Sequence, residues 1–130
     1  MKKQNRLIRI KRVYEPPHGS DGTRVLVDRL WPRGLRKEKA ALACWLKEIA
    51  PSKRLREWFG HEPERYGEFA RRYRAELAGN KEEVARLLDL AKQGSLTLLY
   101  AAHDEEHNHA LVLADYLRKH MERDHGKRPV

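Results

Sequence analysis

The stretch VLVDRLWPRG, residues 25–34, decides the fold, because it joins a buried strand to a loop rich in charged and aromatic side chains. Its first three residues form a continuous apolar run, which is typical of a strand covered on both faces. An acid, two arginines, a tryptophan and a proline then follow within six residues. A simple connection needs only a residue such as Gly or Asn to reverse the chain. The surplus of side-chain chemistry therefore predicts a functional site at the end of this strand.

Strands are predicted on both sides of this stretch. Alternating apolar residues predict a strand at 6–13, and apolar runs predict strands at 23–30 and 95–102. Between 36 and 50 the apolar spacing favours a helix, with a short helix followed by an extended stretch near Trp45 as the alternative.

Capping signals predict where helices begin in the second half of the chain. Ser52 precedes a short apolar pattern at 53–59, and we interpret it as an N-cap and not a nucleophile, because no G-x-S-x-G motif surrounds it. Asn80 and Glu83 have the spacing of a capping box. Asp104 is the predicted N-cap of the last helix.

Length and composition predict one cytoplasmic domain. A chain of 130 residues can bury a core without disulfides or metals, and we place the domain at residues 1–122 and a flexible basic tail at 123–130. The single cysteine, Cys44, excludes an internal disulfide framework. The sequence shows neither a signal peptide nor the roughly 20 apolar residues of a membrane span. We therefore expect no membrane partner.

The net charge of +9 favours anionic partners. Acidic residues are also numerous and mix with the basic ones on the predicted helix faces. No helix-turn-helix, zinc-finger, RRM or KH signature is present. Nucleic acid is therefore the less favoured partner, and a small anion the more favoured one.

Parallel α/β sheets bind ligands at the carboxyl ends of their strands. The predicted strand ends carry DRLWPRG and HDEEHNH, so these two segments are the candidate site. In the first, Arg29 and Arg33 could clamp a carboxylate or phosphate. The alternative is that Arg29 forms an ion pair with Asp28 or Asp104. Trp31 is predicted to pack as a lid over the edge of the core.

The second segment supplies a candidate proton-transfer residue. His107 and Asn108 are predicted in the first helical turn, where free amides favour an anion and a histidine could act as acid or base. The alternative is that Asp104 caps the helix and the histidines lie on an exposed turn without a functional role. We expect no metal, because HDEEH lacks both the glutamate that follows the first zincin histidine and a third ligand.

Three blocks carry a family resemblance: RVLVDRLWPRGLRKEKA, WLKEIAPSKRLREWFGHEPERYGEFARRYRAEL and TLLYAAHDEEHNHALVLADYL. With them the chain, over about residues 6–120, resembles the YeaO-like branch of domain of unknown function 488. The resemblance implies a Rossmann-like α/β fold, no established activity, and a strand at CWLKEI after a short helix at 36–42. The wider family has an Asp-Val-Arg stretch, where Asp28 and Arg29 fall here. It also has a Cys-His-Arg stretch, replaced here by HNHA, so a cysteine nucleophile is not carried over.

Together these observations predict a small three-layer Rossmann-like α/β domain with a mostly parallel sheet flanked by helices. The predicted function is binding of a small phosphate- or carboxylate-bearing ligand in a polar cleft, with hydrolase or transferase chemistry left open. The alternatives are a nucleic-acid module and a protein-interaction domain. No cofactor or metal is expected, and it is open whether Trp31 fills the cleft. The predicted site consists of His107 as the catalytic candidate and the ligand-binding residues Asp28, Arg29, Arg33, Asp104 and Asn108.

Overall fold

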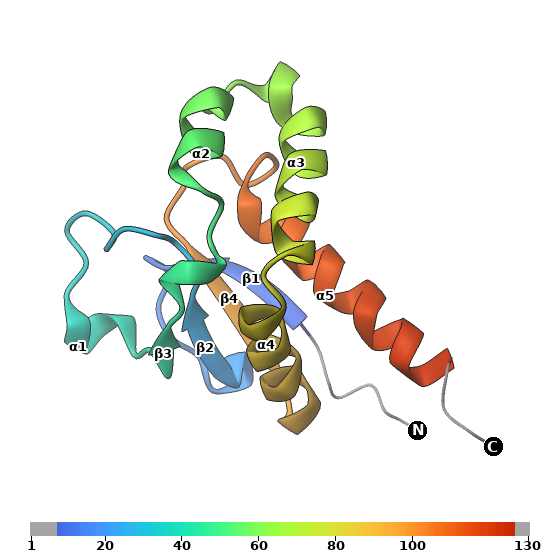
Figure 1. Ribbon diagram of the computed structural model, residues 1–130. Coiled ribbons are helices and arrows are strands. Elements are labelled where there is room, and N and C mark those ends of the chain that lie inside the picture. Colours follow the sequence, from blue (N-terminus) through green and yellow to red (C-terminus); the bar gives the residue numbers. More distant parts are fainter. Residues whose placement is uncertain (1–7, 127–130) are drawn as a thin grey trace.

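Four parallel strands form one sheet in the computed structural model, which describes the backbone of residues 8–126 and the side chains of residues 8–122 (Figure 1). Within these residues the strand order is β1-β4-β2-β3, and every neighbouring pair is parallel. The last strand in the sequence therefore lies between the first two. The strands are β1 (Ile8–Arg12), β2 (Thr23–Leu26), β3 (Cys44–Trp45) and β4 (Leu96–Tyr100).

Helices alternate with the strands, which confirms a mixed α/β domain of Rossmann-like layering. Three short 3-10 helices, η1 to η3, complete the described elements. The α-helices are α1 (Lys37–Ala40), α2 (Lys53–Phe59), α3 (Tyr66–Ala78), α4 (Lys81–Gln93) and α5 (His109–Gly126), and the 3-10 helices are η1 (Gly19–Asp21), η2 (Lys47–Ile49) and η3 (Pro63–Arg65).

The two faces of the sheet are covered differently. The four longer helices pack on one face, and their buried side chains form one cluster with alternate residues of the strands. The opposite face has a smaller cluster of Val13, Leu26 and Leu99, covered by Trp31 and Trp45. Parallel strands require cover on both faces, and a loop carrying α1 provides it on this second face.

The segment 42–49 is neither a helix nor a full strand. Only Cys44–Trp45 pairs with β2, at the edge of the sheet, and η2 follows directly. The helix that the spacing favoured is wrong here, because pairing with β2 and the hydrogen bond from Trp45 Nε1 to the carbonyl of Asp28 (2.7 Å) hold the chain extended. The short helix predicted before it is present as α1.

Ser52 caps α2 as predicted, with its Oγ accepting from the amide of Leu55 at 3.2 Å. The predicted capping box of α4 is wrong. Asn80 precedes that helix but makes no cap hydrogen bond, and its Nδ2 donates to the carbonyl of Glu48 at 2.8 Å. A tertiary contact has therefore replaced the local one.

The start of α5 differs from the prediction that Asp104 caps it. The helix begins at His109, and the Oδ1 of Asn108 accepts from the amide of Leu111 at 3.0 Å. Asp104 lies four residues earlier, in the loop that follows β4. The asparagine is the cap because its side chain is the one within reach of the third helical amide.

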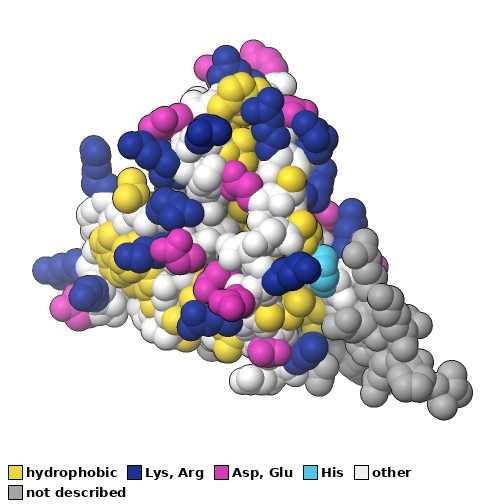
Figure 2. Space-filling view, in the orientation of Figure 1, with side chains coloured by type: hydrophobic (Ala, Val, Ile, Leu, Met, Phe, Trp, Pro, Cys, Tyr) yellow, Lys and Arg dark blue, Asp and Glu magenta, His cyan; other side chains and the backbone are white. Residues whose placement is uncertain are grey.

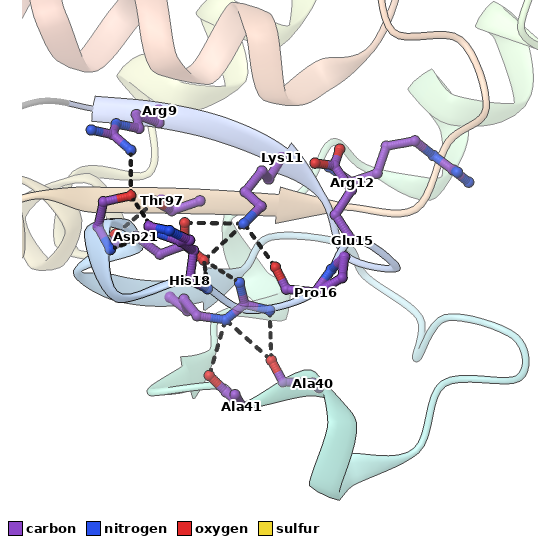
Figure 3. A network of polar contacts seen from close by, with 12 residues as sticks. Arg9, Lys11, Arg12, Glu15, Pro16, His18, Asp21, Ala40, Ala41 and Thr97 are labelled. Atoms are coloured by element: carbon purple, nitrogen blue, oxygen red, sulfur yellow. Dashed lines mark hydrogen bonds and ion pairs between the residues drawn. The ribbon is translucent and has the colours of Figure 1, made fainter.

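A buried polar network holds the amino-terminal ends of β2 and β4 (Figure 3). Asp21, 2 % exposed, accepts from Lys11 Nζ at 3.0 Å and from Arg24 Nη1 at 2.6 Å. Burial alone raises the pKa of this carboxyl, but the hydrogen bonds from Lys11, the His18 amide and Arg24 outweigh it and lower the pKa to about 2. Thr97 Oγ1 donates to the carbonyl of Asp21 at 2.7 Å.

The backbone of α5 continues through Gly126, past the predicted domain end at residue 122. The rest of the predicted tail, 127–130, lies outside the described residues. Within residues 8–126, no helix combines the length and apolar character needed to cross a membrane.

Candidate functional site

A pocket of about 430 Å³ lies at the carboxyl ends of β2 and β4. The loop after β2, helix α2 and the loop between β4 and α5 form its walls, as the strand-end rule predicts for a parallel sheet. Of the predicted site residues, all but Asp104 lie on these walls. The structure therefore brings the two predicted segments together around one cavity.

Asp28 follows β2 and is engaged within the protein. Its Oδ2 accepts from the amide of Ala101 at 3.0 Å, and its Oδ1 lies 3.3 Å from Nε2 of His109. That Oδ1 is buried and accepts no hydrogen bond from the described residues, because the proton on Nε2 of His109 is directed to the carbonyl of Val27 at 3.0 Å. Asp28 thus positions the pocket wall.

Arg29 is also held internally. Its Nη2 and Nε donate to the carbonyls of Ala50 (3.1 Å) and Pro51 (3.4 Å). Its Nη1 lies 3.6 Å from Oε1 of Glu48. The predicted alternative, an ion pair of Arg29 with Asp28 or Asp104, is wrong. The guanidinium instead contacts the segment that leads into α2. Arg29 therefore links two loops, and few of its N–H groups are left to donate to a ligand.

Trp31 and Arg33 lie on the same loop with different surroundings. Trp31 Nε1 donates to the carbonyl of Leu35 at 2.8 Å, and its ring meets Trp45 edge-on at 5.4 Å. Trp31 is therefore a lid over the second face, as predicted, and the pocket volume shows that it leaves the cavity open. Arg33 is exposed, and its carbonyl accepts from Tyr14 Oη at 2.9 Å.

His107 lies in the loop before α5, not in the helical turn predicted for it. Its Nδ1 is 2.9 Å from Oδ2 of Asp104, and its ring meets Tyr66 edge-on at 5.2 Å. Hydrogen bonds from the Glu106 amide and from His107 lower the pKa of Asp104, so the carboxylate accepts and Nδ1 carries the proton. The other ring nitrogen, Nε2, is then the basic one in the neutral ring.

Asn108 is a structural residue of the wall. Besides capping α5, its side chain donates through Nδ2 to the carbonyl of Asp104 at 3.0 Å, and only 2 % of the residue is exposed. Its own carbonyl accepts from Tyr66 Oη at 2.8 Å. Both polar ends of the side chain are used, so Asn108 shapes the loop.

The structure adds Arg56, to which the sequence pattern assigned no site role. Arg56 is half-buried in α2 and lines the pocket. Its Nε is buried without a hydrogen-bond partner, and no ion pair reaches its guanidinium from the described part of the chain. Arg29 donates to two carbonyls, whereas the side chain of Arg56 makes no hydrogen bond or ion pair with the described residues. In the sequence, Arg56 precedes Phe59 by three residues within SKRLREWFGH, so a helix over this segment places both side chains on one face.

His61 is a second wall residue with no predicted role. It adopts a positive φ of 59°, directly after Gly60 at 54°. A left-handed conformation is uncommon and costly for a residue with a side chain, and such conformations cluster at ligand sites. The turn after α2 carries His61 to the pocket rim, with its ring 6.0 Å from that of Phe59.

The pocket has no hydroxyl or thiol nucleophile, although histidines and acids line it. Its walls contain no Ser, Thr or Cys. Cys44 lies elsewhere, on β3, and burial raises the pKa of its thiol. Among the described residues, no group of three or more His, Cys, Asp or Glu side chains is arranged to hold a metal ion.

Comparison with known proteins defines the family. The family profile DUF488-N3i, described as "Inactive DUF488-N3 subclade", matches residues 7–130. The chain is 55% identical over 111 residues to YeaO of Escherichia coli (strain K12), spanning 85% of this chain and 96% of YeaO. It is 46% identical over 110 residues to Rv3073c of Mycobacterium tuberculosis (strain ATCC 25618 / H37Rv) and to Mb3100c of Mycobacterium bovis (strain ATCC BAA-935 / AF2122/97), spanning 85% of this chain and 92% of each relative. All three are described as uncharacterized proteins, and no solved structure matches. Because the profile spans nearly the whole chain, the protein belongs to the DUF488-N3i subclade, and its resemblance to the YeaO-like branch is a family relationship.

Proposed function

We propose that this protein is a cytoplasmic binding protein that holds a small anionic ligand in the strand-end pocket without chemically converting it. The single observation that supports this most directly is Arg56 in the pocket wall, whose Nε is buried without a hydrogen-bond partner. A partly buried cation without a partner carries a desolvation cost, which an anionic ligand offsets. Bidentate donors suit carboxylate or phosphate oxygens.

Binding is favoured over catalysis for two reasons. The pocket walls offer no Ser, Thr or Cys for covalent chemistry, so the hydrolase or transferase option lacks a side-chain nucleophile of that kind. The description of the matching family as inactive points the same way. In this proposal His107, the earlier proton-transfer candidate, lines the pocket and transfers no proton.

Nucleic acid is a weaker candidate. In the view of Figure 2, Lys and Arg side chains are spread among acidic ones and form no single basic stripe. A single-strand groove needs several exposed aromatics among its positive charges, whereas Tyr73 is fully buried and Tyr14 is the aromatic residue described as exposed. A protein-interaction surface is weaker still, because Tyr14 and Leu30 are the large apolar residues described as exposed.

Thermal shift and calorimetry with a panel of carboxylates, inorganic phosphate and nucleotides test the proposal. A bound anion should raise the melting temperature of the wild type. Arg56→Gln should weaken that binding at least tenfold. Arg54→Gln, on the exposed side of the same helix and away from the pocket, should not.

A parallel titration with a short oligonucleotide at rising salt separates the alternative. Binding only to the oligonucleotide, fading as salt rises and equally sensitive to both arginine variants, would replace the pocket proposal with the nucleic-acid one.

A further inference from the structure

We infer that the ligand is an amphipathic monocarboxylate, with its carboxylate on Arg56 and an aromatic or branched apolar body against Phe59. This inference rests on the proposed anion-binding function and adds the chemical class. Three observations on the pocket carry it: its charge, its backbone amides and its apolar wall.

The local charge suits one negative charge better than two. The walls carry the cations Arg29, Arg33 and Arg56 and the acids Asp28 and Glu57, which leaves one net positive charge with neutral histidines. A phosphate dianion placed here would exceed the charge available to neutralise it.

Three backbone amides in and just before the start of α5 are already hydrogen-bonded to side chains. Phosphate sites at helix starts depend on unpaired backbone N–H groups that point at the ligand. Here the amides of Glu106 and His107 donate to Oδ1 of Asp104, at 2.9 and 3.1 Å. The amide of Leu111 donates to Asn108. One of these three amides belongs to the first turn of α5 and the other two to the loop before it, so three backbone donors on this side of the pocket are already used.

The apolar wall supplies the second half of the recognition. Phe59 and Phe69 stack with ring centroids 4.5 Å apart, and both rings line the pocket. Pro51 and Ala102 extend this surface. Because residues three apart on a helix share a face, Arg56 and Phe59 are neighbours on α2, so a carboxylate bound to the guanidinium brings its attached carbon chain against the ring.

The pocket volume agrees with such a ligand. About 430 Å³ lies in the range of sites that enclose small organic molecules. Acetate would leave most of this space and the aromatic wall unused. An aryl-substituted acid such as 3-phenylpropionate would bury apolar area against the wall, which adds affinity in proportion to the area removed from water.

Calorimetry on the full-length protein with five probes tests the inference: 3-phenylpropionate, acetate, 3-phenyl-1-propanol, phenyl phosphate and inorganic phosphate. We expect 3-phenylpropionate to bind at least tenfold more tightly than each of the others. Phe59→Leu should weaken 3-phenylpropionate severalfold and leave acetate unchanged. Circular dichroism and the melting temperature of each variant establish that it is folded, and the five wild-type measurements stand on their own if it is not.

The outcomes separate the class of ligand from the existence of the site. Tighter binding of phenyl phosphate or inorganic phosphate, lost in Arg56→Gln, would overturn the monocarboxylate inference and retain the anion site. Equal binding of acetate and 3-phenylpropionate would overturn the role of the apolar wall. No binding by any of the anions, or binding that Arg56→Gln leaves unchanged, would overturn the proposed function itself.

Discussion

The Oδ2 of Asp28 accepts a hydrogen bond of 3.0 Å from the amide of Ala101, so one carboxylate joins the ends of the two central strands. Its Oδ1 lies 3.3 Å from His109 at the start of α5. The same side chain thus sets the spacing of three elements that form the pocket wall. These contacts follow from where the two strands end.

Asp28→Ala should lower the free energy of unfolding by about 1–3 kcal/mol, because the amide of Ala101 loses its partner in a partly buried place. Asp28→Asn should cost less, since the amide oxygen can still accept that hydrogen bond. Urea unfolding monitored by tryptophan fluorescence measures both. An alanine variant as stable as the wild type would show that the contact contributes nothing.

The pH dependence of stability should reveal Asp21. Its pKa in the folded protein is about 2, below the ordinary value of 3.8, so its ionised form stabilises the fold above about pH 4 and that contribution disappears as the pH falls through 2. The shift corresponds to roughly 2 kcal/mol. In urea unfolding at several pH values, the difference between the wild type and Asp21→Asn should shrink between pH 4 and 2. A difference that is constant over this interval would contradict the assignment.

Gly22→Ala should be severely destabilising. A Cβ at this position would lie 2.3 Å from the carbonyl oxygen of Ser95, a backbone atom that already accepts from the amide of Thr23. The residue also has a φ of 66°. Steric overlap and backbone strain together predict a loss of about 3–5 kcal/mol.

Gly34→Ala is the matched control for this prediction. Its φ is 75°, but nothing lies within 4 Å of the added Cβ. Only the left-handed conformation is penalised, at about 1 kcal/mol. Equal losses in the two variants, measured by chemical denaturation, would show that the close approach to Ser95 is unimportant.

Ser52→Ala should cost more than Asn80→Ala, although both residues precede helices. Ser52 caps α2 and also donates through Oγ to Oε2 of Glu76 at 2.6 Å, so its loss should cost about 1–2 kcal/mol. Asn80 makes no cap hydrogen bond and loses one exposed contact, which should cost under about 1 kcal/mol. The reverse order in thermal unfolding would contradict the observed caps.

Apolar patterning predicted most of the fold. The apolar runs around Val25 and Leu98 became the two central strands, because strands buried on both faces are rich in apolar residues. In α3 the buried residues Phe69, Tyr73 and Leu77 recur at helical spacing. The pattern failed where tertiary contacts compete with local ones: Trp45 is held extended by pairing with β2, and Asn80 bonds Glu48 instead of capping its own helix.

The place of the candidate site was predictable, and its chemistry was not. The strand-end rule located the pocket because it depends only on topology. Which arginine remains unpaired depends on distant carbonyls: those of Ala50 and Pro51 satisfy Arg29, and no equivalent group reaches Arg56. Such pairings join positions about twenty residues apart, so no local spacing in the sequence reports them.

The position of β4 between β1 and β2 affects how the protein folds during its synthesis on the ribosome. The first two strands are neighbours in the sequence but not in the sheet, so neither has its main partner until Leu96–Tyr100 emerges. About three-quarters of the chain is therefore translated before the sheet can close. Until then the nascent chain carries unpaired strand edges and apolar surface, the features that recruit chaperones and promote aggregation. Folding of this protein is thus a late event of its synthesis, completed by about its last quarter.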